Sequence, residues 1–171
     1  MQDEGEIDLG ETRTERPGSP KELYTETVRS EWIDRNGHMN SAYYVLAFDQ
    51  SASAYLSDVG ISDDYVKDHS CGVFWGDLQI RYVKEVVEGD VLTFRYQIIN
   101  YDKKGLHLWQ EMLHYERGFL AAECEMLVLH VDLAKRKVKN FPNEVRDRIA
   151  EKYAGDSNTP FPKGLGRKIS L

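Results

Sequence analysis

Residues Ser41–Val59, with the sequence S-A-Y-Y-V-L-A-F-D-Q-S-A-S-A-Y-L-S-D-V, decide the fold. The stretch contains no glycine or proline before Gly60, and its turns over Ala42–Phe48 would be apolar on every side of a helix. A helix without a polar face has to be buried within a protein. Asn40 or Ser41 is suited to cap its N-terminus, and Gly60 is suited to end it. We therefore expect a long helix at the centre of the molecule.

Segments typical of β-strands lie on both sides of this helix. They are rich in branched and aromatic residues, and glycine-containing turns follow several of them. The expected strands are Glu22–Val28, Val73–Val83, Val91–Tyr101, Leu106–Tyr115 and Phe119–Asp132, and a short helix is expected at Asn143–Tyr153. Turns of this kind favour an antiparallel meander. The order predicts an α+β domain in which about five antiparallel strands wrap around the long apolar helix.

Composition limits the class of protein. A chain of 171 residues is long enough for one domain with its own core. We expect residues 1–20 to be disordered or loosely docked, residues 21–153 to form the domain, and residues 154–171 to form an irregular tail. The net charge of −7 argues against a nucleic-acid partner. No apolar run approaches the roughly 18 residues that cross a bilayer, and the acidic N-terminus is unlike a signal peptide, so a cytoplasmic location is expected.

The segment before the helix, Trp32–Asn40 (W-I-D-R-N-G-H-M-N), contains the residues suited to chemistry. Asp34 supplies a carboxylate, and Gly37 allows a sharp turn or the close approach of a ligand. The first N–H groups of a helix lack partners within it and favour negative charge, so donors are expected near Asn40, Ser41 and Ala42. A carboxylate beside such donors can drive acyl transfer, with the donors holding the oxyanion. The structural alternative is that Asp34 or Asn40 only caps the helix and that His38 only packs.

Other polar residues are weaker candidates. Asp49, inside the helix, either orients substrate or a neighbouring loop, or faces a polar gap or a dimer interface. His107 and Glu111 would share one face of a strand while His114 points to the other, so no metal site is expected. Cys71 and Cys124 are expected to be free thiols.

The motif and the order of elements resemble the hotdog-fold acyl-CoA thioesterases, specifically the 4-hydroxybenzoyl-CoA thioesterase-like group. Members carry a D-x-x-G-H-x-N stretch followed by tyrosine, which here corresponds to Asp34, Gly37, His38, Asn40 and Tyr43 or Tyr44. The resemblance runs from about Leu23 to Pro142. It implies that Asp34 is the nucleophile or general base, that the backbone N–H of Ser41 binds the thioester oxygen, and that His38 and Asn40 support this geometry. It also implies that coenzyme A belongs to the substrate and that no separate cofactor is needed, and we expect Gly37 and Tyr43 to contact substrate. A homodimer or a dimer of dimers is expected because such a sheet has to cover its edges and its outer face.

A closer resemblance is to the betainyl-CoA thioesterases of carnitine degradation. Those enzymes carry E-W-x-D-x-N-G-H-M, which is similar to Glu31–Met39, and a later passage similar to Gly105–Leu108 and Glu125–Asp132, with Gly105 where arginine is usual. A trimethylammonium acyl group favours aromatic surroundings, for which the candidates are Trp32, Trp75 and Trp109. Two other functions stay open: an enoyl-CoA hydratase that uses Asp34 and His38, and a non-catalytic acyl-CoA sensor.

Overall fold

The computed structural model describes residues 23–168. The expectation for residues 1–20 therefore lies outside the described part of the chain. In chain order the elements are β1 (Thr25–Thr27), η1 (Ser30–Trp32), α1 (Ser41–Asp58), α2 (Asp63–His69), β2 (Cys71–Tyr82), β3 (Val91–Tyr101), β4 (Gly105–His114), β5 (Leu120–Asp132), β6 (Lys137–Val138) and α3 (Asn143–Asp156).

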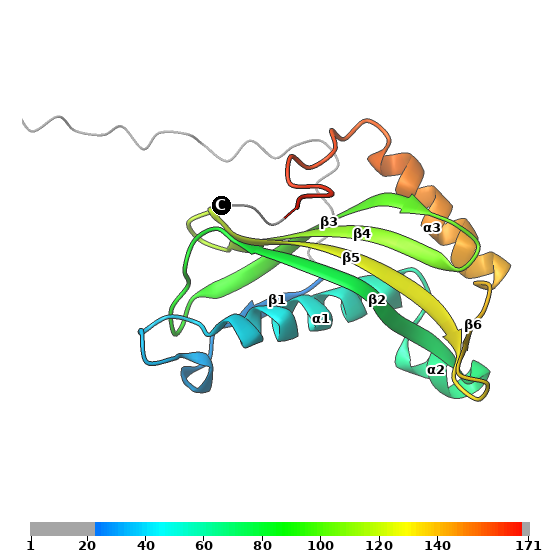
Figure 1. Ribbon diagram of the computed structural model, residues 1–171, viewed down its shortest axis with the longest axis horizontal. Coiled ribbons are helices and arrows are strands. Elements are labelled where there is room, and N and C mark those ends of the chain that lie inside the picture. Colours follow the sequence, from blue (N-terminus) through cyan, green and yellow to red (C-terminus); the bar gives the residue numbers. More distant parts are fainter. Residues whose placement is uncertain (1–22, 169–171) are drawn as a thin grey trace, which may run out of the picture.

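The strands form one curved antiparallel sheet in the order β1-β3-β4-β5-β2, with the short β6 paired to β5 (Figure 1). The predicted meander is confirmed for β3, β4 and β5, which pair in sequence. It is wrong for β2, which pairs with β5 and not with β3. The reason is that α1 and α2 carry the chain from the β1 edge of the sheet to the opposite edge before β2 begins.

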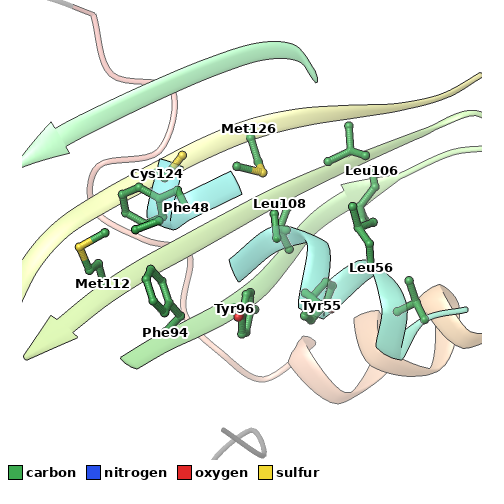
Figure 2. Close-up of a cluster of buried hydrophobic side chains, with 14 of the residues drawn as sticks. Phe48, Tyr55, Leu56, Phe94, Tyr96, Leu106, Leu108, Met112, Cys124 and Met126 are labelled. Atoms are coloured by element: carbon green, nitrogen blue, oxygen red, sulfur yellow. The ribbon is translucent and has the colours of Figure 1, made fainter. Parts of the chain in front are cut away.

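Helix α1 packs along the concave face of the sheet, as the sequence predicts (Figure 1). Its Ala47, Phe48 and Ala52 are fully buried. The small alanines let the helix backbone approach the strands, and Phe48 meets the ring of Phe94 edge-on at 5.9 Å between centroids. Figure 2 shows the same core, in which α1 residues face side chains from β3, β4 and β5 that include Tyr96.

The expectation that α1 is buried on every side is wrong for a single chain. Val45 and Leu46 are 40% and 37% exposed, and Ala42 is also exposed. The sheet covers only one face of the helix, so these apolar residues project from the other. The N-terminal half of α1 thus presents an apolar surface beside the sheet.

Three elements were not predicted from the sequence: η1, α2 and β6. Helix α2 is capped by Ser62, whose side chain accepts a hydrogen bond from the Tyr65 N–H. Helix α3 continues past Tyr153 to Asp156, so the irregular tail starts later than residue 154. The extension has a cause, because the Asp156 carboxylate accepts the Ile98 N–H at 2.9 Å beside a bulge in β3.

The chain after α3 crosses the convex face of the sheet, opposite α1 (Figure 1). The Gly166 N–H donates to Glu125 at 2.8 Å, and the Gln97 amide donates to the carbonyl of Thr159. None of the helices within residues 23–168 is long and apolar enough to cross a membrane.

Candidate active site

The Trp32–Asn40 segment folds as a tight hairpin. Ile33 and Met39 form an isolated antiparallel bridge, and the N–H of Asp34 donates to the carbonyl of His38 at 3.0 Å. The turn is closed by Gly37, whose φ of +82° lies in the left-handed region that favours glycine. Apart from its two chain neighbours, no described residue has an atom within 4 Å of the position that a Cβ would take there, so the requirement for glycine is conformational and not steric.

The base of this hairpin is anchored in the core. The Asn40 N–H donates to the carbonyl of Trp32, and the Met39 N–H donates to Val86 in the connection between β2 and β3, both at 2.9 Å. Trp32 and Met39 are 2% and 1% exposed. The tip of the hairpin is therefore held at a defined place beside the start of α1 while its polar residues reach solvent.

The Asp34 carboxylate is held by amide groups of the turn. One oxygen accepts the Asn36 N–H at 2.7 Å, and the other accepts the Asn36 side-chain amide at 3.4 Å. The side chain keeps 21% of its surface exposed. His38 does not form a hydrogen bond with it, because Nδ1 lies 3.8 Å from the carboxylate and 3.3 Å from the carbonyl of Met39. The carboxylate is thus oriented and still reachable by a substrate.

The start of α1 uses most of the N–H groups that the sequence suggested would be free. The Ala42 N–H donates to the Asn40 side chain at 3.0 Å, and the Tyr43 N–H donates to the Asn40 carbonyl. Because the Asn40 N–H donates to the carbonyl of Trp32, the expectation of free N–H donors at Asn40 and Ala42 is wrong. The N–H of Ser41 differs, because it has no acceptor among residues 23–168. One open donor remains at the positive end of the helix dipole.

The remaining candidate residues form two pairs. The rings of Trp32 and Tyr43 are stacked, with centroids 5.2 Å apart and an interplanar angle of 12°. The indole N–H of Trp75 donates to the Asp49 carboxylate at 2.7 Å. Trp75 is therefore the hydrogen-bond partner of Asp49. The first pair adjoins the hairpin, whereas the second lies farther along α1. Trp32 is buried, so little of its ring is open to a substrate. Its contact with substrate stays a prediction, as do the roles of the other site residues.

One residue near the site was missed. Tyr82 ends β2, is 51% exposed, and its hydroxyl donates to the Ser41 carbonyl at 3.4 Å. Its ring also meets Tyr44 edge-on at 5.1 Å. Nothing in the sequence links residues so far apart, because their proximity depends on β2 pairing with β5 at the sheet edge.

Other reactive side chains have structural partners. His107 pairs with Glu125 at 2.8 Å, and His114 pairs with Asp90 at 3.2 Å, so the two histidines do not meet. Within residues 23–168 no group of three or more His, Cys, Asp or Glu side chains could hold a metal. Burial raises the pKa of the Cys124 thiol to about 12, which keeps it protonated and unreactive at neutral pH.

Comparisons of the sequence and of the structure with known proteins agree on the family. A sequence model of the Thioesterase-like superfamily matches residues 28–149. The betainyl-CoA thioesterase of Pseudomonas aeruginosa is 29% identical over 148 residues, which are 86% of this chain and 93% of the relative. A Staphylococcus aureus protein solved in complex with CoA superposes with a TM-score of 0.81 at 30% identity, over 86% of this chain and 93% of that chain.

A putative thioesterase from Pseudomonas putida KT2440 has a TM-score of 0.75 at 27% identity, over 87% of this chain and 95% of that chain. These matches confirm the predicted hotdog fold and the predicted class of enzyme. The family match covers most of the chain, including the Asp34 hairpin, α1 and all the strands after it. The chain therefore belongs to the Thioesterase-like superfamily.

Proposed function

We propose that this chain hydrolyses acyl-CoA thioesters at the hairpin before α1, with Asp34 as nucleophile or general base. The observation that carries the proposal is the Ser41 N–H, which no acceptor among the described residues uses and which stands at the start of the helix. Asp34, in the hairpin directly before it, is oriented by Asn36. A donor for an oxyanion and a carboxylate in one rigid unit are the two components that thioester hydrolysis requires.

The chemistry follows from these two groups. The thioester oxygen accepts a hydrogen bond from the Ser41 N–H, and negative charge that develops on it is stabilised by the helix dipole. Asp34 then either attacks the carbonyl carbon, giving an acyl anhydride that water hydrolyses, or removes a proton from the attacking water. In both routes the C–S bond breaks, CoA leaves as the thiol, and the acyl group leaves as a carboxylate.

The other residues of the hairpin support this geometry. Gly37 permits the turn that orients Asp34, and Asn40 caps the helix through the Ala42 N–H. Asn40 accepts hydrogen bonds from the N–H groups of Ala42 and Tyr43, so the Ser41 N–H is left as the free donor. Tyr43 stacks on Trp32 and so fixes the first turn of α1 on the hairpin. For the acyl group we propose a small one, with betainyl as the first candidate because the Pseudomonas aeruginosa relative is named for it.

We also propose that the chain works as a homodimer or a dimer of dimers. Among the described residues β2 pairs only with β5, so its other edge is free. Exposed apolar side chains lie on this strand and on α1, including Phe74 at 42% and Leu46 at 37%. A long free edge beside an apolar surface is normally covered in a protein. A second copy of the chain would cover the free edge of β2 and these exposed apolar side chains. The subunit interface would then lie next to the active-site hairpin.

The test is thiol release from a panel of acyl-CoA thioesters, followed with a chromogenic thiol reagent. We expect hydrolysis by the unmodified chain and a loss of about a hundredfold or more in kcat for Asp34→Asn. Asparagine keeps an oxygen that can accept the Asn36 N–H, so the hairpin should persist. Asp63→Asn, which removes an exposed carboxylate at the start of α2, is the matched control and should retain full activity.

The two rival functions give different results in the same assay. A hydratase would consume an enoyl-CoA without releasing thiol, and a sensor would bind acyl-CoA without turning it over. The distance of 3.8 Å between His38 and Asp34 does not favour the Asp–His pair of a hydratase. Near-normal hydrolysis by Asp34→Asn would exclude the proposed role of this carboxylate.

A further inference from the structure

The turn between β5 and β6 and the turn between β3 and β4 form a basic corner on an acidic protein. The two turns lie side by side, because the Lys104 carbonyl accepts the His130 N–H and the Lys103 carbonyl accepts the Phe141 N–H. The chain as a whole has a net charge of −7. Six exposed cationic side chains nevertheless lie in this basic corner: Lys103, Lys104, Lys135, Arg136, Lys137 and Lys139.

Most of these cations have no acidic partner. Within residues 23–168, Lys139 is the only one of the six that forms an ion pair, with Asp132 at 3.8 Å. The two carboxylates of the basic corner are also used by the backbone, since Asp132 accepts the Lys135 N–H and Asp102 accepts the Lys104 N–H. A group of cations that outnumbers its acids in this way attracts a ligand with several negative charges.

Arg136 occupies a backbone position that favours glycine. Its φ of +54° lies in the left-handed region, which costs a residue with a side chain roughly 1 kcal/mol or more. Its guanidinium lies 5.4 Å from the centroid of the Phe74 ring. Departures of this kind from local rules tend to occur at functional sites. A guanidinium is planar and can donate two parallel hydrogen bonds to one phosphate group.

We propose that the basic corner of one subunit binds the phosphate groups of an acyl-CoA whose thioester lies in the active site of the other subunit. The inference rests on the proposed thioesterase function and on the proposed homodimer, and it adds the residues that hold the CoA part of the substrate. Coenzyme A carries a pyrophosphate and a further phosphate on its ribose. Lysine and arginine are the side chains that bind such groups by charge-assisted hydrogen bonds.

Within one subunit the basic corner is too far from the thioester site. The two lie at opposite ends of β2, because Cys71 pairs with Asp132 whereas the Tyr82 hydroxyl donates to the Ser41 carbonyl (Figure 1). From Cys71 to Tyr82 the strand rises about 36 Å. The arm of CoA has about thirteen bonds from sulfur to the first phosphorus, which span about 16 Å when extended. A CoA bound at Ser41 therefore ends its arm about 20 Å short of the basic corner of its own subunit.

A second copy of the chain removes this gap. A two-fold axis pairs the free edge of β2 with the same edge of the second copy, and the two strands then run antiparallel. Pairing along the whole strand places the Cys71 end of one β2 beside the Tyr82 end of the other. Strand β6 of the second copy then lies three strand spacings from this end, about 14 Å. This separation is close to the length of the CoA arm.

A kinetic test removes either the phosphates or the cations. KM is measured for the acyl-CoA of the panel that is hydrolysed best and for its acylpantetheine, which ends before the phosphates. Lys135→Ala/Lys137→Ala should raise KM for the acyl-CoA about tenfold and leave KM for the acylpantetheine unchanged. The matched control, Lys163→Ala/Arg167→Ala, removes the same charge from exposed positions in the C-terminal segment and should change neither value. An unchanged KM for the acyl-CoA, or an equal rise for both thioesters, would overturn the phosphate site.

A mixed dimer tests whether the basic corner acts on the other subunit. The Asp34→Asn chain, in which the corner is intact, is co-expressed with the Lys135→Ala/Lys137→Ala chain under a different affinity tag, and dimers with both tags are purified. Only the second chain keeps Asp34, so turnover reports a site that receives its basic corner from the first chain. KM for the acyl-CoA should return to that of the unmodified chain. A KM that stays about tenfold higher would show that the corner does not act across the interface.

A binding measurement separates this inference from the catalytic proposal. Titration calorimetry with CoA itself should show a Kd about tenfold higher for Lys135→Ala/Lys137→Ala than for the unmodified chain. If this difference is found but no acyl-CoA releases thiol, the phosphate site is supported and the thioesterase proposal fails. If acyl-CoA thioesters are hydrolysed but the two Kd values are equal, the phosphate site fails and the thioesterase proposal stands.

Discussion

The sharpest prediction concerns the Ser41→Pro substitution. Ser41 is the first residue of α1, a position at which proline is favoured because its missing N–H would have no partner within the helix. The preceding residue, Asn40, has φ −63° and ψ 141°, which is the extended conformation that a residue before proline adopts. Ser41 is exposed, so the proline ring has room. The substitution removes one N–H group and the serine hydroxyl.

The size of the effect follows from the role of that N–H. If it binds the thioester oxygen, its loss should lower kcat by roughly 10²–10³, equivalent to about 2.7–4 kcal/mol. The same change should leave the free energy of unfolding unchanged or raise it by up to about 1 kcal/mol, because proline restricts the unfolded chain. For a chain of this size that corresponds to a rise in Tm of no more than about 4 °C. Activity and stability should therefore separate.

The assay is thiol release under saturating acyl-CoA, with Tm measured on the same preparation. Ser41→Ala is the matched control, since it removes the hydroxyl and keeps the N–H, and it should retain most of the activity. A Ser41→Pro chain that folds with unchanged Tm and still turns over at the normal rate would refute the assignment of this N–H as the oxyanion donor. A lower Tm would instead show that the proline disturbs the helix start.

Two further predictions concern assembly and pH. If the chain forms the proposed homodimer or dimer of dimers, Leu46→Glu should convert it to a 19.7 kDa monomer in light scattering. Phe161→Glu, at a side chain that is 66% exposed in the C-terminal segment, should leave the mass unchanged. An unchanged mass for Leu46→Glu would contradict the proposed interface. Burial alone would raise the pKa of Asp90, but hydrogen bonds from the Val87 N–H and His114 more than offset it, so the pKa is lowered. Its stabilising contribution is therefore present above the unfolded pKa of about 3.9 and is lost as pH falls through the lower folded value. Asp90→Asn should lower the free energy of unfolding by about 1–2 kcal/mol at pH 7, and this deficit should shrink below about pH 4 in urea titrations; a deficit independent of pH would contradict the assignment.

Sequence patterns predicted which segments form helices and strands better than they predicted which of these elements lie side by side. The apolar run from Ala42 predicts a helix, and the alternating apolar residues of Val91–Tyr101 predict β3, because both signals are local. The pairing of β2 with β5 was not predicted, since register between distant strands depends on packing against α1. The exposure of Val45 and Leu46 was not predicted for a related reason, because an apolar residue looks the same in sequence whether or not the sheet covers it.

The candidate site shows the same limit at closer range. Asp34, Gly37 and Asn40 could be selected from their residue types, and the left-handed φ of Gly37 could be expected from a turn. The sequence could not show which N–H groups are free, because the acceptors for the N–H groups of Asn40 and Ala42 depend on how the hairpin closes. The partners of Asp49 and the position of Tyr82 likewise require the sheet to be in place.

The start of α1 departs from what stability alone would favour. Acidic residues in the first turn normally stabilise a helix by offsetting its positive end, and α1 has none there. The same turn leaves the Ser41 N–H without an acceptor among the described residues, although Asn40 satisfies its neighbour. Helix α2 shows the usual pattern, with Asp63 and Asp64 in its first turn. The missing acidic residues are a departure from a local rule, and such departures tend to occur at functional sites. The open N–H of Ser41 is ordinary for the first residue of a helix, but with no acid beside it the positive potential stays available to an external anion, which is what a thioester oxygen becomes during hydrolysis.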